Sequence, residues 1–309
     1  NSMSEKFNSL DNRKKGLIYI ILYAISIALM NTLLKLAGPI PPTEKIVYKS
    51  FICIIGGFIV IAKTYGFKDK GRFIGNKKNI FGLSIRTICG LTGGTANIYA
   101  LQYLILSTSS VIQDLSVFFL VIFSFIFLKE KIKFWQVVLI CVGFVGAVFV
   151  INPSSAKFVL TPSLAAIFGS AMNAGDSVSM RYLRKTASPS TIVFFYNVAC
   201  AVVLTPFMLM DYKVLTIKAM TYLLLSGVCY LVVEFAITSA YKYAPAREIA
   251  IFSYIDVIFS AVLGFIVFGS LPTIISIIGY IIILAAAITL VLYNSKTTDS
   301  SKQETKATS

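Results

Sequence analysis

The chain has 309 residues, of which 57% are hydrophobic and only 13% are charged. A soluble protein usually carries about 25% charged residues, so this composition, with a mean hydropathy of +0.83, predicts a polytopic membrane protein and argues against disordered, secreted and nucleic-acid-binding classes. The formal net charge is +15, histidine is absent, and the five cysteines lie inside apolar stretches. A disulfide framework, an imidazole-ligated metal and a histidine-dependent catalytic triad therefore have no support.

A helix needs roughly 20 mainly apolar residues to cross the hydrocarbon core of a bilayer. Ten segments reach or approach this length, so we predict an all-α membrane protein with ten transmembrane helices. In chain order, the predicted spans are Gly16–Leu36, Glu44–Ala62, Ile80–Leu101, Ser107–Leu128, Phe134–Ile151, Pro162–Leu183, Thr191–Met210, Ala219–Tyr241, Glu248–Phe268 and Thr273–Tyr293. Residues 1–15 are a predicted cytoplasmic segment, and residues 294–309, rich in Ser, Thr and Lys, are a predicted disordered cytoplasmic tail.

Basic residues are distributed unevenly between the two sides of the predicted bundle. The set of loops that includes both chain termini holds most of the 28 Lys and Arg. The other set contains only Lys157, Lys213 and Lys218, with Lys45 at its edge. The positive-inside rule therefore predicts cytoplasmic termini. Abundant Ile, Lys, Asn and Phe suggest a bacterial source, hence the bacterial cytoplasmic membrane, with anionic lipid headgroups as partners of the basic loops.

The chain also matches itself at a shift of 140 residues, with Ala100–Ala147 running alongside Ala240–Ala287. Residues 16–151 and 162–293 therefore form two predicted five-helix repeats, joined by a loop at residues 152–161. An odd number of spans places the second copy upside down relative to the first, so we predict inverted repeats around a central cavity. The alternative is that apolar helices resemble one another by composition alone.

The region Leu106–Val150 resembles the repeat of the EamA branch of the drug/metabolite transporter superfamily. The similarity includes Leu128-Lys129-Glu130 at the end of the fourth span, Gly143 and Gly146 in the fifth, Lys49 early in the second, and Arg86-Thr87 in the third. It covers about residues 16–293. The chain departs from the family pattern at Val117 and Val257, where proline is usual, and at Ser270, where the second repeat usually has Glu.

This resemblance implies a basket of ten helices with both termini cytoplasmic. It implies a central cavity lined mainly by the first, third, fourth, sixth, eighth and ninth spans, while the fifth and tenth spans are peripheral. We expect the glycines of the fifth span, with Gly279 in the tenth, to serve helix packing.

Several ionisable residues lie within predicted spans, where each costs roughly 2.5–3.5 kcal/mol if it faces lipid. They are Lys35, Lys49, Arg86, Asp114, Asp176, Glu234 and Asp256. Helical spacing places polar neighbours beside most of them: Asn31 with Lys35, Arg86 with Asn97, Ser110 with Asp114, Tyr230 with Glu234, and Ser253 with Asp256. For Lys35, Lys49 and Asp176, which lie near predicted helix ends, snorkelling or capping is an equally good explanation.

We therefore predict a secondary transporter for a small organic metabolite, with these charged side chains around its cavity. A cavity with charges of both signs suits a zwitterionic or cationic substrate, such as an amino acid or an amino-acid derivative. The resemblance adds S-adenosylmethionine, which some members of the family carry. Because no P-loop is present, we expect transport to be driven by proton coupling or by exchange with a counter-substrate. We also expect no cofactor, and a monomer or weak homodimer. The candidate substrate-binding or proton-coupling residues are Asn31, Lys35, Arg86, Asn97, Asp114, Asn173, Tyr230, Glu234, Ser253 and Asp256.

Two other functions are compatible with a polytopic chain. The stretch Asn173-Ala174-Gly175-Asp176 resembles the Gly-x-Gly-Asp motif of intramembrane aspartyl proteases, but the first glycine is missing and Ile255 separates Tyr254 from Asp256. A channel is the other alternative, and the sequence contains no filter-like motif that favours it.

Overall fold

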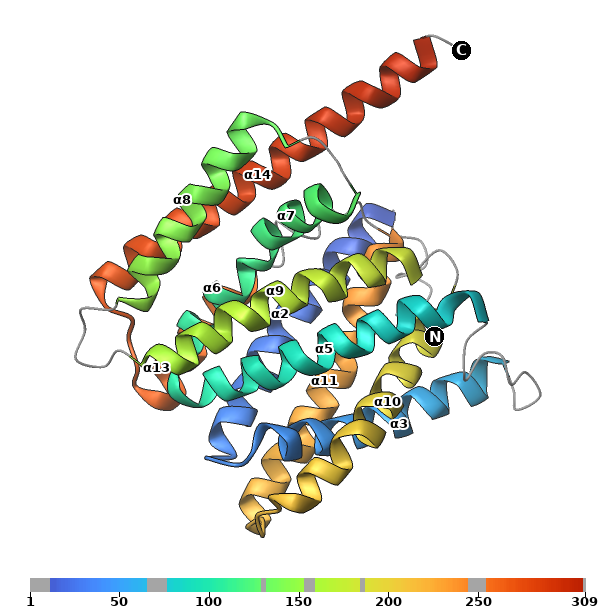
Figure 1. Cartoon of the computed structure of the whole chain (residues 1–309). Coiled ribbons are helices and arrows are strands. Elements are labelled where there is room, and N and C mark those ends of the chain that lie inside the picture. Colours follow the sequence, from blue (N-terminus) through green and yellow to red (C-terminus); the bar gives the residue numbers. More distant parts are fainter. Residues whose placement is uncertain are drawn as a thin grey trace.

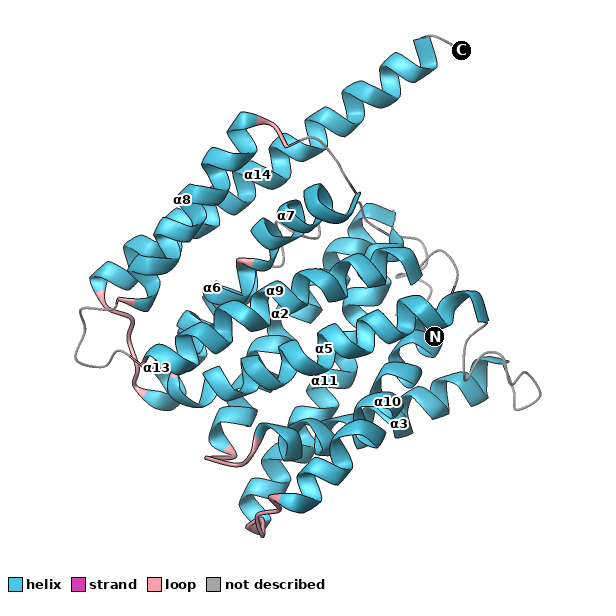
Figure 2. Ribbon diagram, in the orientation of Figure 1, coloured by secondary structure: helices cyan, strands magenta, loops and turns pink. Residues whose placement is uncertain are grey.

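The computed structural model describes residues 12–65, 77–128, 132–152, 159–183, 187–243 and 254–307. Within these ranges the chain is helical and contains no strands (Figure 2). The helices are α2 (Asn12–Leu36), α3 (Pro42–Tyr65), α5 (Lys77–Tyr103), α6 (Leu106–Asp114), α7 (Ser116–Leu128), α8 (Phe134–Ile151), α9 (Leu160–Leu183), α10 (Pro189–Met210), α11 (Ile217–Tyr243), α13 (Ile255–Phe268) and α14 (Ile274–Ala307).

Seven stretches are long and apolar enough to cross a membrane: Lys14–Leu36, Pro42–Lys63, Leu106–Phe123, Phe134–Ile151, Ser190–Met210, Ile217–Ala240 and Ile274–Tyr293. The outer surface is strongly apolar, with Phe81, Phe134 and Met210 at least 74% exposed. Such a surface suits lipid rather than water. The chain is therefore a multi-pass helical membrane protein.

The remaining described helices are either less apolar or shorter. α5 and α9 carry Arg86, Asn97, Asn173 and Asp176 along faces turned toward the interior. α13 begins at Ile255 and is a shorter apolar helix. Residues 248–253 of the predicted span Glu248–Phe268 lie outside the described residues.

The fourth predicted span is not one continuous helix. α6 ends at Asp114, and α7 begins at Ser116. At the junction, the Leu115 amide donates to the carbonyl of Ile112, 3.1 Å away, which is a tighter turn than the α-helical pattern. The Gln113 carbonyl accepts a hydrogen bond from the Ser170 hydroxyl on α9 at 3.2 Å. The break therefore occurs inside the bundle, where a side chain from another helix satisfies the backbone.

Pairs of helices from the two halves of the chain pack along one another (Figure 1). α2 packs with α11, α5 with α9, α3 with α10, and α8 with α14. Between α5 and α9 the approach is close, because a Cβ added at Gly93 would lie 2.7 Å from the Cβ of Met172. The α8–α14 pair lies at one side of the bundle, and α14 projects beyond it (Figure 1).

The C-terminal region differs from its prediction, because α14 continues past Tyr293 to Ala307. No Gly or Pro follows Gly279, so nothing in the sequence terminates the helix where the apolar residues end. The predicted disordered tail at residues 294–309 is therefore largely helical in the structure.

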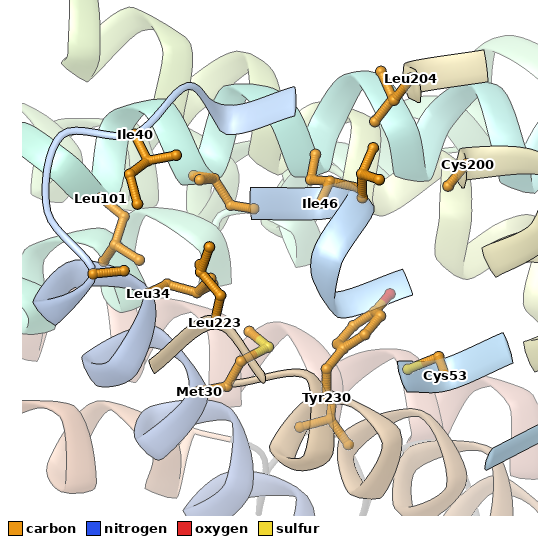
Figure 3. Close-up of a cluster of buried hydrophobic side chains, with 14 of the residues drawn as sticks. Met30, Leu34, Ile40, Ile46, Cys53, Leu101, Cys200, Leu204, Leu223 and Tyr230 are labelled. Carbon is orange, nitrogen blue, oxygen red and sulfur yellow. The ribbon is translucent and has the colours of Figure 1, made fainter. Parts of the chain in front are cut away.

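Two apolar clusters hold the helices together. One joins α2, α3, α10 and α11, where Leu34, Ile46, Cys53 and Leu223 are almost completely buried (Figure 3). The other joins α6 and α7 to α8 and α14. Its packing is close, because a Cβ added at Gly143 on α8 would lie only 2.4 Å from Cζ of the Phe118 ring. Both clusters reach the interior cavity, whose wall includes Met30 and Tyr230 of the first cluster and Tyr254 of the second.

Candidate functional site

A cavity of about 300 Å³ lies in the interior of the bundle. Its wall receives residues from α2, α3, α5, α6, α7, α9, α10, α11 and α13, whereas the described residues of α8 and α14 contribute none. The peripheral position of the fifth and tenth spans agrees with what the resemblance implied. The second and seventh spans also contribute one residue each to the wall, Lys49 and Tyr196.

Arg86 is the centre of a buried ionic network at the cavity. Its Nη2 lies 2.7 Å from Glu234 Oε2 on α11, and its Nη1 lies 3.7 Å from Asp176 Oδ1 on α9. The guanidinium carbon also lies 4.9 Å from the centre of the Tyr196 ring on α10. With 2% of its side chain exposed, Arg86 has its charge neutralised by neighbouring helices rather than by solvent.

Close packing around a glycine allows the Tyr196 ring to approach α5. A Cβ added at Gly90, one helical turn after Arg86, would lie only 2.7 Å from Tyr196 Cε2. A larger residue at this position would therefore displace the ring from the guanidinium.

Lys49 is held differently from Arg86. Its ammonium group lies 4.0 Å from the centre of the Tyr230 ring, in a cation–π contact. The residue is 7% exposed and borders the cavity. Within the described part of the chain, Lys49 has no carboxylate at ion-pair distance and no hydrogen-bond acceptor.

Asp114 and Asp256 border the cavity from α6 and α13. Asp114 is the last residue of α6, and Asp256 is in the first turn of α13. Oδ2 of Asp114 and Oδ1 of Asp256 are buried and have no hydrogen-bond partner. Neither carboxylate forms an ion pair with any described basic residue. Nearby, the hydroxyl groups of Ser110 and Ser260 are 2.8 Å apart and connect α6 to α13.

The cavity brings together most of the residues that the sequence singled out. Those that line it are Asn31, Arg86, Asn97, Asp114, Asn173, Tyr230, Glu234 and Asp256. Lys35 is placed elsewhere: its ammonium donates to the Leu104 carbonyl and lies 5.5 Å from the Phe268 ring centre. Ser253 lies outside the described residues.

Lys49, Asp176 and Tyr196 belong to the cavity wall, although none of them was among the predicted site residues. Lys49 and Asp176 were equally compatible with capping or snorkelling because they lie near the ends of predicted spans. Their positions toward other helices, rather than toward the interface, follow from tertiary packing. Asp176 lies 3.7 Å from Arg86, and this arrangement gives no support to the hypothesis that Asp176 belongs to an intramembrane aspartyl protease.

The EamA-like transporter family matches residues 14–152 and 160–292. The pseudopaline exporter of Pseudomonas aeruginosa strain UCBPP-PA14 is 27% identical, covering 91% of this chain and 97% of that protein. The riboflavin transporter of Brucella anthropi is 28% identical, with coverages of 70% and 78%. The S-adenosylmethionine uptake transporter of Rickettsia bellii is 26% identical, with coverages of 68% and 72%.

One crystal structure matches with a TM-score of 0.63 and 16% sequence identity, covering 93% of this chain and 98% of the other. At this identity the match shows the fold alone. The family match, in contrast, extends over nearly all the described helices and confirms the resemblance seen in the sequence. It also points to transport rather than catalysis. The chain belongs to the EamA-like transporter family, within the drug/metabolite transporter superfamily.

Proposed function

We propose that this protein is a secondary active transporter that moves a small zwitterionic or cationic metabolite across a bacterial cytoplasmic membrane. The observation that carries the proposal is the interior cavity, whose wall contains Lys49, Arg86, Asp114, Glu234 and Asp256. Buried ionisable groups in a membrane protein are costly unless they meet one another, water or a ligand. Their concentration around a cavity of ligand size supports a substrate site.

The proposed mechanism is alternating access by two inverted five-helix halves. Helix packing supports it: exchanging the first five spans for the last five converts the α2–α11 pair into the α9–α5 pair. The same exchange maps the α3–α10 and α8–α14 pairs onto themselves. Symmetry-related halves that rock around a fixed site expose it to each side in turn. Both termini are cytoplasmic in this proposal, in agreement with the basic loops.

The proposed substrates are amino acids, amino-acid derivatives or S-adenosylmethionine. The names of the relatives span pseudopaline, riboflavin and S-adenosylmethionine, which supports organic metabolites as a class. The presence of both acidic and basic groups in one cavity favours a ligand that also carries both charges. Transport is driven by a proton gradient or by exchange with a counter-substrate.

A binding screen tests the substrate class. Purified protein is heated in the presence of amino acids, nucleosides, S-adenosylmethionine or polyamines, and its unfolding temperature is measured. A ligand at 100 times its Kd stabilises the folded state by about 2.7 kcal/mol. We expect a zwitterion or an organic cation to raise the unfolding temperature. Stabilisation by uncharged nucleosides alone would contradict the proposed class.

Flux measurements in proteoliposomes test the mechanism. We expect Glu234→Gln and Asp256→Asn each to abolish saturable flux while the protein remains folded. Glu44→Gln is a matched control, because Glu44 is also buried but accepts from the Lys213 amide at 3.4 Å, away from the cavity. Wild-type flux in both cavity variants would remove these carboxylates from the mechanism, and flux that never saturates would favour a channel.

A further inference from the structure

The charged side chains around the cavity form two separate clusters. The first contains Arg86 with its ion-pair partners Glu234 and Asp176, together with Lys49, on which the charge of Glu234 acts; these residues come from α3, α5, α9 and α11. The second, here called the aspartate pair, contains Asp114 and Asp256 from α6 and α13, and Asp114 is acted on by Asp256. A ligand in the cavity therefore meets two different electrostatic environments.

Within the first cluster, the cation with unused capacity is Lys49. Arg86 already has Glu234 at 2.7 Å and Asp176 at 3.7 Å. Lys49 is more than nine-tenths buried, and its ammonium lies 4.0 Å from the centre of the Tyr230 ring without a hydrogen bond or ion pair to any described residue. An ammonium carries three hydrogen-bond donors, and an aromatic face satisfies none of them fully. A ligand carboxylate that enters the cavity would supply the missing acceptor.

The aspartate pair, in contrast, requires a cationic partner. Asp256 is 8% exposed, and one oxygen of each carboxylate is buried without a partner. Asp114 also lies at the C-terminal end of α6, where the helix dipole contributes partial negative charge. A broken transmembrane helix of this kind places its C-terminal end where a cation is stabilised. No described basic side chain is paired with either aspartate, so a cationic group that enters the cavity would meet two carboxylates without an ion-pair partner among the described residues.

We infer that the cavity binds its substrate in one orientation, with an anionic group on Lys49 and a cationic group on the aspartate pair. This inference rests on the proposed transport function and assigns the two ends of the substrate. It also separates Glu234 from direct cation binding, because Arg86 already occupies that carboxylate. The substrate is thus an elongated zwitterion whose two charged groups are recognised by different helices.

Three related molecules separate the two interactions. S-adenosylmethionine carries a carboxylate with an ammonium on the same carbon, and a sulfonium farther away. Decarboxylated S-adenosylmethionine lacks only the carboxylate, and S-adenosylhomocysteine lacks only the sulfonium charge, so the pair of analogues tests the carboxylate and the distant cation separately. Their Kd values are measured for the 309-residue chain in detergent. A site built around a charged group rejects the analogue that lacks it. We therefore expect the wild-type protein to bind S-adenosylmethionine at least about tenfold more tightly than either analogue.

The variants then assign each preference to its residue. Lys49→Met should remove the preference over the decarboxylated analogue and retain the preference over S-adenosylhomocysteine. Asp114→Asn and Asp256→Asn should each remove the preference over S-adenosylhomocysteine and retain the preference over the decarboxylated analogue. Lys45→Met is the control, because Lys45 lies one turn away on α3 and its ammonium donates to the Leu34 and Gly38 carbonyls at 2.7 and 2.8 Å. It should lower the unfolding temperature without changing either Kd ratio.

The outcomes distinguish this inference from the transport function. If wild-type proteoliposomes take up S-adenosylmethionine but Lys49→Met leaves both Kd ratios unchanged, the orientation is wrong and the transporter remains. The same holds if the two aspartate variants keep the wild-type ratios. If the wild-type protein binds none of the three molecules, the elongated zwitterion and its orientation are contradicted, whereas the transport function is still tested by the amino acids of the binding screen.

Discussion

Arg86 on α5 and Glu234 on α11 form an ion pair of 2.7 Å in which 2% and 9% of the side chains are exposed. The two residues lie 148 positions apart in the sequence, so the pair connects the two halves of the chain. Asp176 on α9 supplies a second carboxylate at 3.7 Å from the same guanidinium. The arrangement is asymmetric, because one cation serves two anions.

This asymmetry predicts unequal effects on stability. Arg86→Met leaves Glu234 and Asp176 without their shared counter-charge, and removal of one partner from a buried pair costs about 3–5 kcal/mol. Glu234→Gln should cost less, because Asp176 remains to neutralise Arg86. The loss of stability is measured for both variants by thermal unfolding in detergent, and the double variant Arg86→Met/Glu234→Gln completes a double-mutant cycle. Equal losses in the two single variants would show that Asp176 does not compensate.

The contact between α5 and α9 is expected to tolerate no side chain at Gly93. Gly93→Ala would place its Cβ 2.7 Å from Met172 Cβ and 3.2 Å from the Gly169 carbonyl oxygen. Overpacking of this kind typically costs about 1–3 kcal/mol. The control is Gly94→Ala, where a Cβ meets nothing within 4 Å. We expect a lower unfolding temperature for Gly93→Ala alone, and similar temperatures for the two variants would contradict the close approach.

Tyr280 connects α14 to the start of α6 in a buried position. Its hydroxyl lies 3.0 Å from the Ser107 hydroxyl and 2.9 Å from that of Thr108. Tyr280→Phe should therefore destabilise the protein by about 1–3 kcal/mol, since each hydrogen bond contributes about 0.5–1.5 kcal/mol. Ser107→Ala removes only one of the two bonds and should have a smaller effect in the same unfolding measurement. An effect of Ser107→Ala as large as that of Tyr280→Phe would argue against two independent bonds.

Ser110 on α6 and Ser260 on α13 provide a test of movement between the halves. Because their hydroxyl oxygens are 2.8 Å apart, cysteines at both positions should form a disulfide under oxidising conditions. In a background without the five native cysteines, we expect the oxidised double variant to lose flux and dithiothreitol to restore it. Each single cysteine variant controls for local effects of the substitution. Full flux through the cross-linked protein would contradict rocking at this contact.

The amino-acid sequence by itself determined where most of the helices lie and which of their faces are polar. The fifth predicted span, Phe134–Ile151, has the same bounds as α8, because a long apolar run ends at Asn152 in the left-handed conformation. The i, i+4 spacing of Tyr230 and Glu234 also predicted that both lie on one polar face, and both line the cavity. Such features depend on helix periodicity and hydrophobicity, which are local properties.

Tertiary structure alone decided how these elements meet. Periodicity cannot distinguish a lysine that caps a helix end from one that borders a cavity, yet Lys35 donates to the Leu104 carbonyl whereas Lys49 lies over Tyr230. At the break after Asp114, the Gln113 carbonyl likewise accepts a hydrogen bond from Ser170 on another helix. The partners of a buried charge come from helices far away in the chain, so their identity follows from packing and the need to neutralise charge away from water.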